Sequence, residues 1–166
     1  MDLTRAIRHC LTGQLAVHRL FPAKSLSTIE QAIKHSETNH QGQICFAVEA
    51  ALRTVPLLKK QTARERAVEV FSQLRIWDTK DNNGVLIYVL LADRDVEIIA
   101  DRGIDAKVTH TEWEAICREM EALFRQQQFE AGVIAGINQV SLHLQRHFPL
   151  QPNHNKNELP DQPIVL

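Results

Sequence analysis

Apolar residues recur at helical spacing in several stretches of the chain, and three of these stretches begin with a helix-capping pattern. In this pattern a Ser or Thr hydroxyl accepts a hydrogen bond from an N–H of the first turn, and a glutamate three residues later bonds back to the backbone. The three pairs are Ser27 with Glu30, Thr62 with Glu65, and Thr109 with Glu112. The apolar spacing predicts a further helix from Phe129 to His147.

Three shorter stretches have the pattern of β-strands. Gln43 to Glu49 alternates, whereas Val85 to Leu91 is apolar throughout, as expected for a strand that is buried on both faces. Asp95 to Ala100 is a third strand, and the polar link at residues 92–95 has the length of a hairpin turn. A doubly buried strand needs helices on both sides of its sheet. The predicted fold class is therefore α/β, a three-layer α/β/α sandwich with a small mixed central sheet.

Residues 1–24 are predicted to form an amphipathic helix and a linker. Leu3, Ile7, Leu11 and Leu15 recur every four residues, which places them along one stripe of a helix. We expect this stripe to pack on the helix's own domain. Attachment to a membrane surface or to a groove in a partner is the alternative.

Residues 150–166 are predicted to form a disordered, proline-rich tail. The sequence after Phe148 contains many polar residues and little material for a core. Its prolines are Pro149, Pro152, Pro160 and Pro163. The domain itself is therefore expected to span residues 25–149.

Composition narrows the classes of function. The chain has 166 residues, of which 44% are hydrophobic, and this is enough to form the core of one domain. The 19 basic and 20 acidic residues leave a formal charge of -1, so no overall field attracts nucleic acid or anionic lipid, and any binding must come from a local site. The apolar runs are shorter than the ~20 residues of a membrane-spanning helix. Three scattered cysteines are typical of reduced thiols in a cytoplasmic protein.

An acidic, asparagine-rich loop precedes the most buried strand. Its oxygen-bearing side chains are Asp78, Asp81, Asn82 and Asn83. Hard cations such as Ca²⁺ and Mg²⁺ bind oxygen ligands of this kind. The same residue types also serve in turns that bind nothing, and this interpretation stays open for the loop on its own.

A second acidic turn follows the third predicted strand and contains Asp101, Arg102 and Asp105. If the second and third strands form a hairpin, the loop and this turn meet at its open end. The two segments together then predict a cation site. Its candidate ligands are Asp78, Asp81, Asn82, Asn83, Asp101 and Asp105.

Several sequence blocks resemble the short, soluble bacterial branch of the TPM-domain family. They are Trp77-Asp78-Thr79, Asn83-Gly84-Val85-Leu86-Ile87-Tyr88, Ala92-Asp93-Arg94 and Ala100-Asp101-Arg102-Gly103-Ile104. The family includes thylakoid-lumen acid phosphatases involved in photosystem II repair and an animal receptor modulator. The resemblance covers residues 21–149. It implies an α/β/α sandwich, divalent-cation binding at loops on one edge of the sheet, and phosphatase activity in some members.

The family's motifs can be carried over to individual positions. Its Asp-Asn-Gly motif falls on Asn82-Asn83-Gly84, so the negative charge must come from Asp81 or Asp78. A glutamate late in the first domain helix is matched by Glu37. Gln43 stands where a glutamate usually precedes the first strand.

Three functional hypotheses follow. The first is a cytoplasmic binding or assembly module that holds Ca²⁺ or Mg²⁺ at the loop edge and contacts a protein partner. The alternative is a metal-dependent acid phosphatase, in which Arg102 binds the phosphate through paired N–H groups. The third is an interaction protein that acts without metal through its N-terminal helix, with peripheral membrane contact as one form of that interaction.

Overall fold

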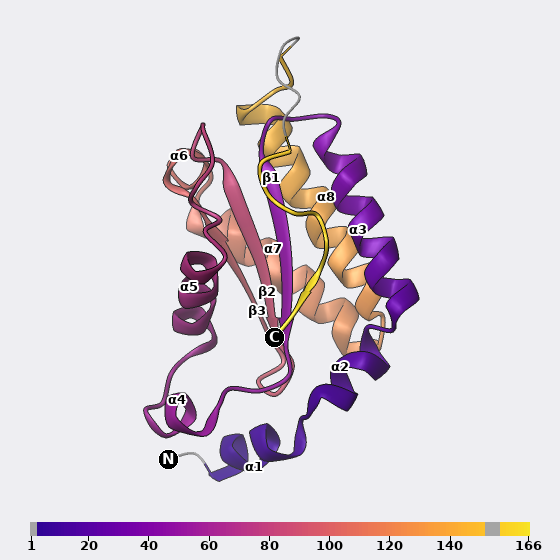
Figure 1. The fold of residues 1–166 in the computed structure, drawn as a ribbon, viewed down its shortest axis with the longest axis vertical. Helices are drawn as coiled ribbons and strands as arrows, with labels where there is room; N and C mark the ends of the chain where they lie inside the picture. The colour runs from indigo at the N-terminus through magenta and orange to yellow at the C-terminus, as the bar shows by residue number, and fades with distance from the viewer. Residues whose placement is uncertain (1–2, 152–156) are drawn as a thin grey trace.

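The centre of the protein is a mixed sheet, shown in the computed structural model in Figure 1, which describes residues 3–151 and 157–166. β1 (Gln43–Glu49) pairs in parallel with β2 (Gly84–Leu90) along its whole length. β2 forms an antiparallel hairpin with β3 (Asp95–Ala100). The predicted strands and their hairpin are confirmed, and the sheet is mixed as expected.

Helices cover both faces of this sheet (Figure 1). α3 (Ala23–Glu37), α7 (His110–Arg125) and α8 (Phe129–His147) pack on one face, and α5 (Ala63–Gln73) packs on the other. Every residue of β1 and β2 is buried between the two layers. The predicted three-layer α/β/α sandwich is therefore confirmed.

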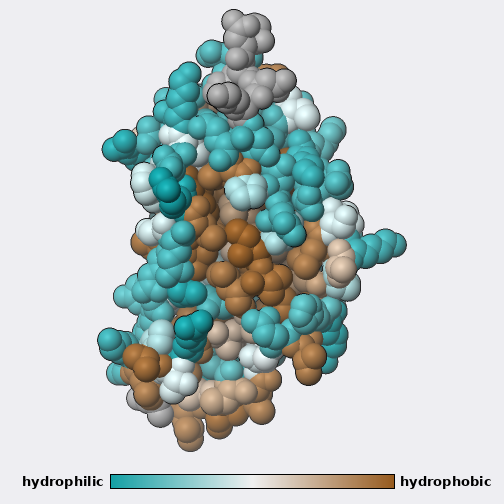
Figure 2. All heavy atoms as spheres, viewed as in Figure 1, coloured by the Kyte–Doolittle hydropathy of each residue, from teal (hydrophilic) through white to brown (hydrophobic). Residues whose placement is uncertain are grey.

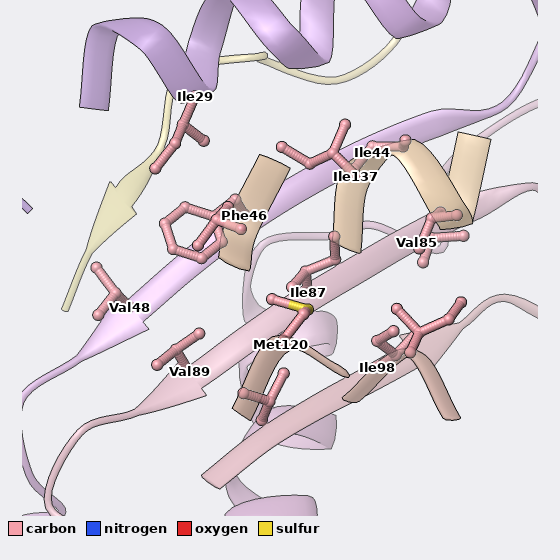
Figure 3. Close-up of a cluster of buried hydrophobic side chains, with 14 of the residues drawn as sticks. Ile29, Ile44, Phe46, Val48, Val85, Ile87, Val89, Ile98, Met120 and Ile137 are labelled. Carbon is pink, nitrogen blue, oxygen red and sulfur yellow. The ribbon is translucent and has the colours of Figure 1, made fainter. Parts of the chain in front are cut away.

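The side chains of β1 and β2 alternate between two hydrophobic clusters, one on each face. Ile44, Phe46 and Val48 point toward α3 and α8, as the close-up in Figure 3 shows, together with Val85 and Ile87 of the neighbouring strand. The residues between them pack toward α5. These are Cys45, Ala47, Leu86, Tyr88 and Leu90.

A buried ion pair joins α5 to the sheet. Glu49 ends β1 with its carboxylate almost inaccessible to solvent. Arg66 of α5 donates to Glu49 Oε2 over 2.8 Å, and the Tyr88 hydroxyl donates to the same oxygen over 2.7 Å. A buried carboxylate needs such partners, because without them its desolvation would cost several kcal/mol.

Two of the three predicted caps are confirmed. Thr62 and Thr109 form complete capping boxes with Glu65 and Glu112 at the starts of α5 and α7. The predicted cap at Ser27 is wrong, because α3 begins one turn earlier, directly after Pro22. Proline is common at the start of a helix, because it has no N–H that the helix would leave unbonded and its φ is fixed near the helical value. Pro22 therefore sets the start of α3.

The N-terminal segment forms two helices, α1 (Leu3–Leu11) and α2 (Gln14–Leu20), which are separated at Gly13. The boundary predicted after residue 24 is wrong, because Val17 and Phe21 are fully buried in the domain core. Residues 1 and 2 lie outside the described residues.

The expected packing of the stripe on α1 is also wrong. Leu3, Ile7 and Leu11, together with Leu15 of α2, point into solvent. A short helix that was not predicted, α4 (Thr54–Leu58), follows β1 in the chain and lies near α1 at the same end of the molecule (Figure 1). None of the helices among residues 3–151 and 157–166 is long and apolar enough to cross a bilayer.

The predicted disordered tail is a further correction for the part of it that the structure describes. Residues 157–166 follow β1, where β4 (Ile164–Val165) pairs in parallel with Ala47 and Val48 and completes the sheet order β3-β2-β1-β4. The few apolar residues of this segment suffice because they meet an unpaired strand edge, whose N–H and C=O groups need partners. Residues 152–156 of the predicted tail lie outside the described residues.

Replacing Leu159 by alanine should lower the free energy of unfolding by about 2 kcal/mol, because this side chain is buried against the α5 face of the sheet. Leu150, which is half exposed, provides the matched control, and its alanine variant should change stability by less than about 0.5 kcal/mol. Urea denaturation measures both. Equal stabilities of the two variants would show that residues 157–166 do not dock on the sheet in solution.

Candidate functional site

The acidic loop leaves α5 and returns the chain to β2 through two residues with positive φ. These are Arg75, with φ of 54°, and Asn82, with φ of 52°. Asparagine adopts this left-handed conformation more readily than most residues. Between them, the Thr79 hydroxyl accepts a hydrogen bond from the backbone N–H of Asn83 over 3.1 Å. This bond fixes the last turn of the loop before the strand.

The second acidic turn contains the short helix α6 (Arg102–Asp105). Asp101 caps this helix, and its Oδ1 accepts a hydrogen bond from the Arg102 N–H over 2.8 Å. The Asp101 N–H donates to the carbonyl oxygen of Gly84 over 2.9 Å, which continues the β2–β3 pairing by one step. The turn is thus attached directly to the start of β2.

The loop and the turn meet at the open end of the hairpin, as predicted. The Gly103 N–H donates to the carbonyl oxygen of Asn82 over 2.9 Å, and Arg102 Nε donates to Asn82 Oδ1 over 3.0 Å. A Cβ at position 103 would lie only 2.5 Å from the Asn82 carbonyl oxygen and 2.6 Å from that of Asp81. The close approach of the two segments therefore requires glycine.

Two buried oxygens at this junction have no hydrogen-bond partner among the described residues. They are Asn83 Oδ1 and Asp101 Oδ2, on the residues that flank the Gly84 pairing. Asn83 is fully buried and Asp101 is 8% exposed. Asn83 Nδ2 donates to the Gln41 carbonyl oxygen over 3.2 Å, which fixes the side-chain orientation. Leaving a buried acceptor unsatisfied costs about 1–3 kcal/mol, so both oxygens favour a bound donor or cation.

The six predicted ligands do not all lie at one site. Asp78 forms an ion pair with Arg75 over 2.7 Å and its side chain is 55% exposed, so it is already paired at the surface. The amide oxygen of Asn82 accepts from Arg102, while Asp81 is half-buried and Asp105 is exposed. Within residues 3–151 and 157–166, no three His, Cys, Asp or Glu side chains are grouped closely enough to hold a metal ion.

The C-terminal segment adds contacts that the sequence analysis missed. Gln43 Oε1 accepts hydrogen bonds from the N–H groups of Glu158 and Leu159 over 2.8 and 3.0 Å. Glu158 Oε2 in turn accepts from the Lys80 N–H over 2.9 Å. The segment is therefore bound to the start of β1 and to the acidic loop. The family resemblance singled out position 43, but nothing in the proline-rich sequence indicated its partner.

Glu37 lies at the same end of the sheet with an unusual carboxyl group. Its Oε1 accepts a hydrogen bond from the Ile44 N–H over 2.9 Å. Burial raises the pKa of this carboxyl to about 8, the Ile44 bond opposes that shift, and the nearby carboxylate of Asp161 adds to it. With this pKa, the Glu37 carboxyl is mostly protonated at neutral pH.

The fold and this oxygen-rich junction define a class of single-sheet α/β/α domains with loops gathered at one end of the central strands. The family model of the TPM domain matches residues 18–142, and the chain belongs to this family.

Solved structures support the same fold. The BA42 protein from the psychrophilic bacterium Bizionia argentinensis is 29% identical, with a TM-score of 0.75 over 86% of this chain and 93% of that one. The N-terminal domain of a P. gingivalis protein is 15% identical, with a TM-score of 0.62 over 84% of this chain and 83% of that one. The N-terminal domain of cg2496 from Corynebacterium glutamicum is 12% identical, with a TM-score of 0.55 over 81% of this chain and 83% of that one. A comparison with curated protein sequences finds no match.

Replacing Gly103 by alanine should lower the free energy of unfolding by about 1–3 kcal/mol, because the new methyl group would push the turn away from the loop backbone. Gly13 is the matched control: a Cβ there meets nothing within 4 Å, and its alanine variant should change stability by less than about 0.7 kcal/mol. Chemical denaturation compares the two variants. A neutral Gly103→Ala would contradict the close contact.

The stability of the protein should fall as the pH rises through the titration of Glu37. Its carboxyl has an ordinary value of 4.5 when unfolded and about 8 when folded, so the folded state binds the extra proton between these values. The stabilisation is complete below the lower value and is lost as the pH rises through the upper one. Glu37→Gln retains an acceptor for the Ile44 N–H and removes the titration.

Urea denaturation at a series of pH values measures this effect as the difference between the wild type and Glu37→Gln. The difference should change steadily across the window between 4.5 and about 8. A difference that does not depend on pH in this window would show that Glu37 is ionised in the folded protein.

Proposed function

We propose that the junction between the acidic loop and the α6 turn binds a divalent cation, Ca²⁺ or Mg²⁺, and that the protein acts as a binding or assembly module. The observation that carries this proposal is the pair of unpartnered buried oxygens, Asn83 Oδ1 and Asp101 Oδ2. Water could satisfy a neutral carbonyl oxygen, but a buried carboxylate oxygen is stabilised most by a positive charge. A hard cation supplies such a charge and prefers oxygen ligands.

The charge around the junction supports a cation rather than an anion. Asp81, Asp101 and Asp105 contribute three carboxylates within the two segments that meet there. Lys80 of the loop and Arg102 of the α6 turn are the basic residues of these segments, and Arg102 Nε is directed to Asn82. The three carboxylates outnumber these two cations by one, so the excess charge is negative and favours a cation over an anion.

The ligand set that we propose is smaller than the one the sequence predicted. Asp78 is left out because it already pairs with Arg75 at the surface, and Asn82 because its side-chain oxygen accepts from Arg102. The remaining candidates supply both charged and neutral oxygens. They are Asn83 and Asp101, whose buried oxygens lack partners, whereas Asp81 and Asp105 lie in the same two segments without forming, together with Asp101, a group of three acids close enough to hold an ion.

Ion binding here would have a structural consequence for recognition. The loop and the turn are joined by two hydrogen bonds, from Gly103 and Arg102 to Asn82. An ion shared by the two segments would stiffen the surface that they form and make it available to a protein partner. We propose a cytoplasmic location for this module, which is supported by the three free thiols of Cys10, Cys45 and Cys117.

We do not propose the phosphatase alternative. Arg102, the candidate phosphate ligand, donates from its side-chain Nε to Asn82, and its backbone N–H donates to the Asp101 cap. A phosphoryl-transfer site needs an attacking group or an activated water in addition to a basic side chain. The geometry around Arg102 supports the cation site more directly than catalysis.

Titration calorimetry with CaCl₂ and MgCl₂ tests the proposal. We expect saturable binding with Kd on the order of 10⁻⁴ M, because the site has few charged ligands. Asp101→Asn should weaken it at least about tenfold, since asparagine retains the cap of α6 but removes the charge.

Asp78→Asn is the matched control, because it removes a carboxylate of the same loop that is paired with Arg75 at the surface. Its affinity should match that of the wild type. Amide NMR shifts during the titration should localise to residues 79–84 and 101–105. The proposal fails if the titration gives neither a saturable heat change nor a shift at these residues, or if both variants lose affinity equally.

A further inference from the structure

The apolar stripe of the N-terminal helix faces outward. Leu3, Ile7 and Leu11 of α1 and Leu15 at the start of α2 are each at least 51% exposed. A short amphipathic helix on a soluble domain normally buries such a stripe, because exposed leucine and isoleucine side chains are costly to hydrate. Something other than the hydrophobic effect must orient α1.

Polar contacts on the opposite side of α1 fix this orientation. Arg5 donates to both carboxylate oxygens of Asp93, in the β2–β3 turn, at distances from 2.7 to 3.1 Å. His9 Nε2 lies 3.0 Å from Asp93 Oδ1, and His9 Nδ1 accepts from the Leu52 N–H over 3.0 Å. Arg5 and His9 are one helical turn apart, and the residue at i+2 points about 200° away from the residue at i. Anchoring their face therefore turns the leucines outward.

The contacts of Asp93 with α1 favour the ionised form of its carboxyl. Burial alone would raise the pKa of the Asp93 carboxyl, but the hydrogen bonds from Arg5 and His9 outweigh burial and lower it. Since Nδ1 of His9 accepts an N–H, the ring proton resides on Nε2 and is donated to the carboxylate. Asp93 is thus an ionised, fully partnered group that holds α1 on the domain.

The exposed apolar surface extends onto α4. Val55 and Leu58 are also mostly exposed, and Arg5 Nη2 donates to the Gln61 carbonyl oxygen just after α4 over 2.7 Å. The two helices lie together at the end of the molecule opposite α6 (Figure 1). Figure 2 shows apolar side chains gathered at this lower end. We call it the apolar end, and its side chains are Leu3, Ile7, Leu11, Leu15, Val55 and Leu58.

The two chain segments that form the apolar end contain basic residues and no acidic ones. Residues 3–20 and 50–64 contain no Asp or Glu, although the whole chain has a formal charge of -1. Their basic residues are Arg5, Arg8, Arg19, Arg53, Lys59, Lys60 and Arg64. Of these, Arg5 and Arg8 lie against Asp93, and Arg64 pairs with Glu97. Lys59 and Lys60 follow Leu58 directly and are exposed. Exposed apolar side chains are therefore bordered by cations without neighbouring acids in their own segments.

We propose that the apolar end docks on the surface of an anionic lipid bilayer. The leucines and their apolar neighbours would enter the boundary between head groups and acyl chains, and the lysines and arginines would contact lipid phosphates. This combination of apolar insertion and basic contacts is how interfacial helices bind membranes. The cation junction lies at the opposite end of β2 and would face away from the membrane.

Charge argues against a second copy of this chain as the occupant. Pairing two apolar ends would bring the cations of one molecule against those of the other, with no acids in either pair of segments. Like charges across an interface oppose association. A bilayer rich in phosphatidylglycerol presents the complementary charge together with an apolar phase.

Co-sedimentation with large unilamellar vesicles tests the proposal. The wild type should bind phosphatidylcholine vesicles that contain phosphatidylglycerol and bind vesicles of phosphatidylcholine alone much more weakly. Leu11→Ser combined with Leu15→Ser should lower the partition coefficient about 100-fold, because two side chains no longer enter the apolar phase. Lys59→Glu combined with Lys60→Glu should lower it by about 30-fold on the anionic vesicles.

The matched control is Val68→Ser combined with Leu142→Ser, which removes two exposed apolar side chains from α5 and α8. This variant should bind as the wild type does, and circular dichroism should show all variants folded. Equal binding by the control and by the leucine variant would overturn the proposal.

Sedimentation velocity without lipid provides a second arm. A wild-type dimer that the leucine variant abolishes, in a protein that does not bind vesicles, would show that the apolar end is a protein interface. That result would also overturn the proposal.

Discussion

Complete burial of two adjacent parallel strands is the constraint on which the rest of the structure depends. β1 and β2 have no exposed residue, so their side chains require apolar partners on both faces of the sheet. Helices α3, α7 and α8 provide these partners on one side and α5 on the other. The loops that connect these layers must gather at the ends of the strands, and both surfaces with proposed functions lie there.

Polar groups buried near the sheet differ in whether all their oxygens have hydrogen-bond partners. Glu49 is fully partnered by Arg66 and Tyr88, so it contributes to the attachment of α5. At the other end of β2, Asn83 and Asp101 each keep one oxygen without a partner among the described residues. The first arrangement is typical of structural stabilisation. The second retains unsatisfied binding capacity, and this difference is why the cation site is proposed at the junction and not elsewhere on the sheet.

The two ends of the molecule carry opposite chemistry. Acidic residues and amide oxygens gather where the loop meets α6, whereas the segments of α1 and α4 carry apolar and basic residues. α6 lies at the opposite end of the molecule from α1 and α4 (Figure 1), and apolar side chains gather at the lower end (Figure 2). Both ends depend on the β2–β3 hairpin, since its open end carries Asp101 and its closed turn carries Asp93. One hairpin thus sets the positions of both surfaces.

The sequence by itself determined the elements whose signals are local. Residues a few positions apart predict the capping boxes at Thr62 and Thr109, the strand bounds and the hairpin. The hairpin in turn predicts that the acidic loop and the α6 turn meet. Tertiary structure alone decided the outward face of α1, the docking of residues 157–166 and the partners of the site residues. Each depends on contacts between distant segments, such as Arg5 with Asp93 and Gln43 with Glu158. No periodic pattern encodes such contacts, because they depend on which polar groups and strand edges remain unpaired after the sheet has formed.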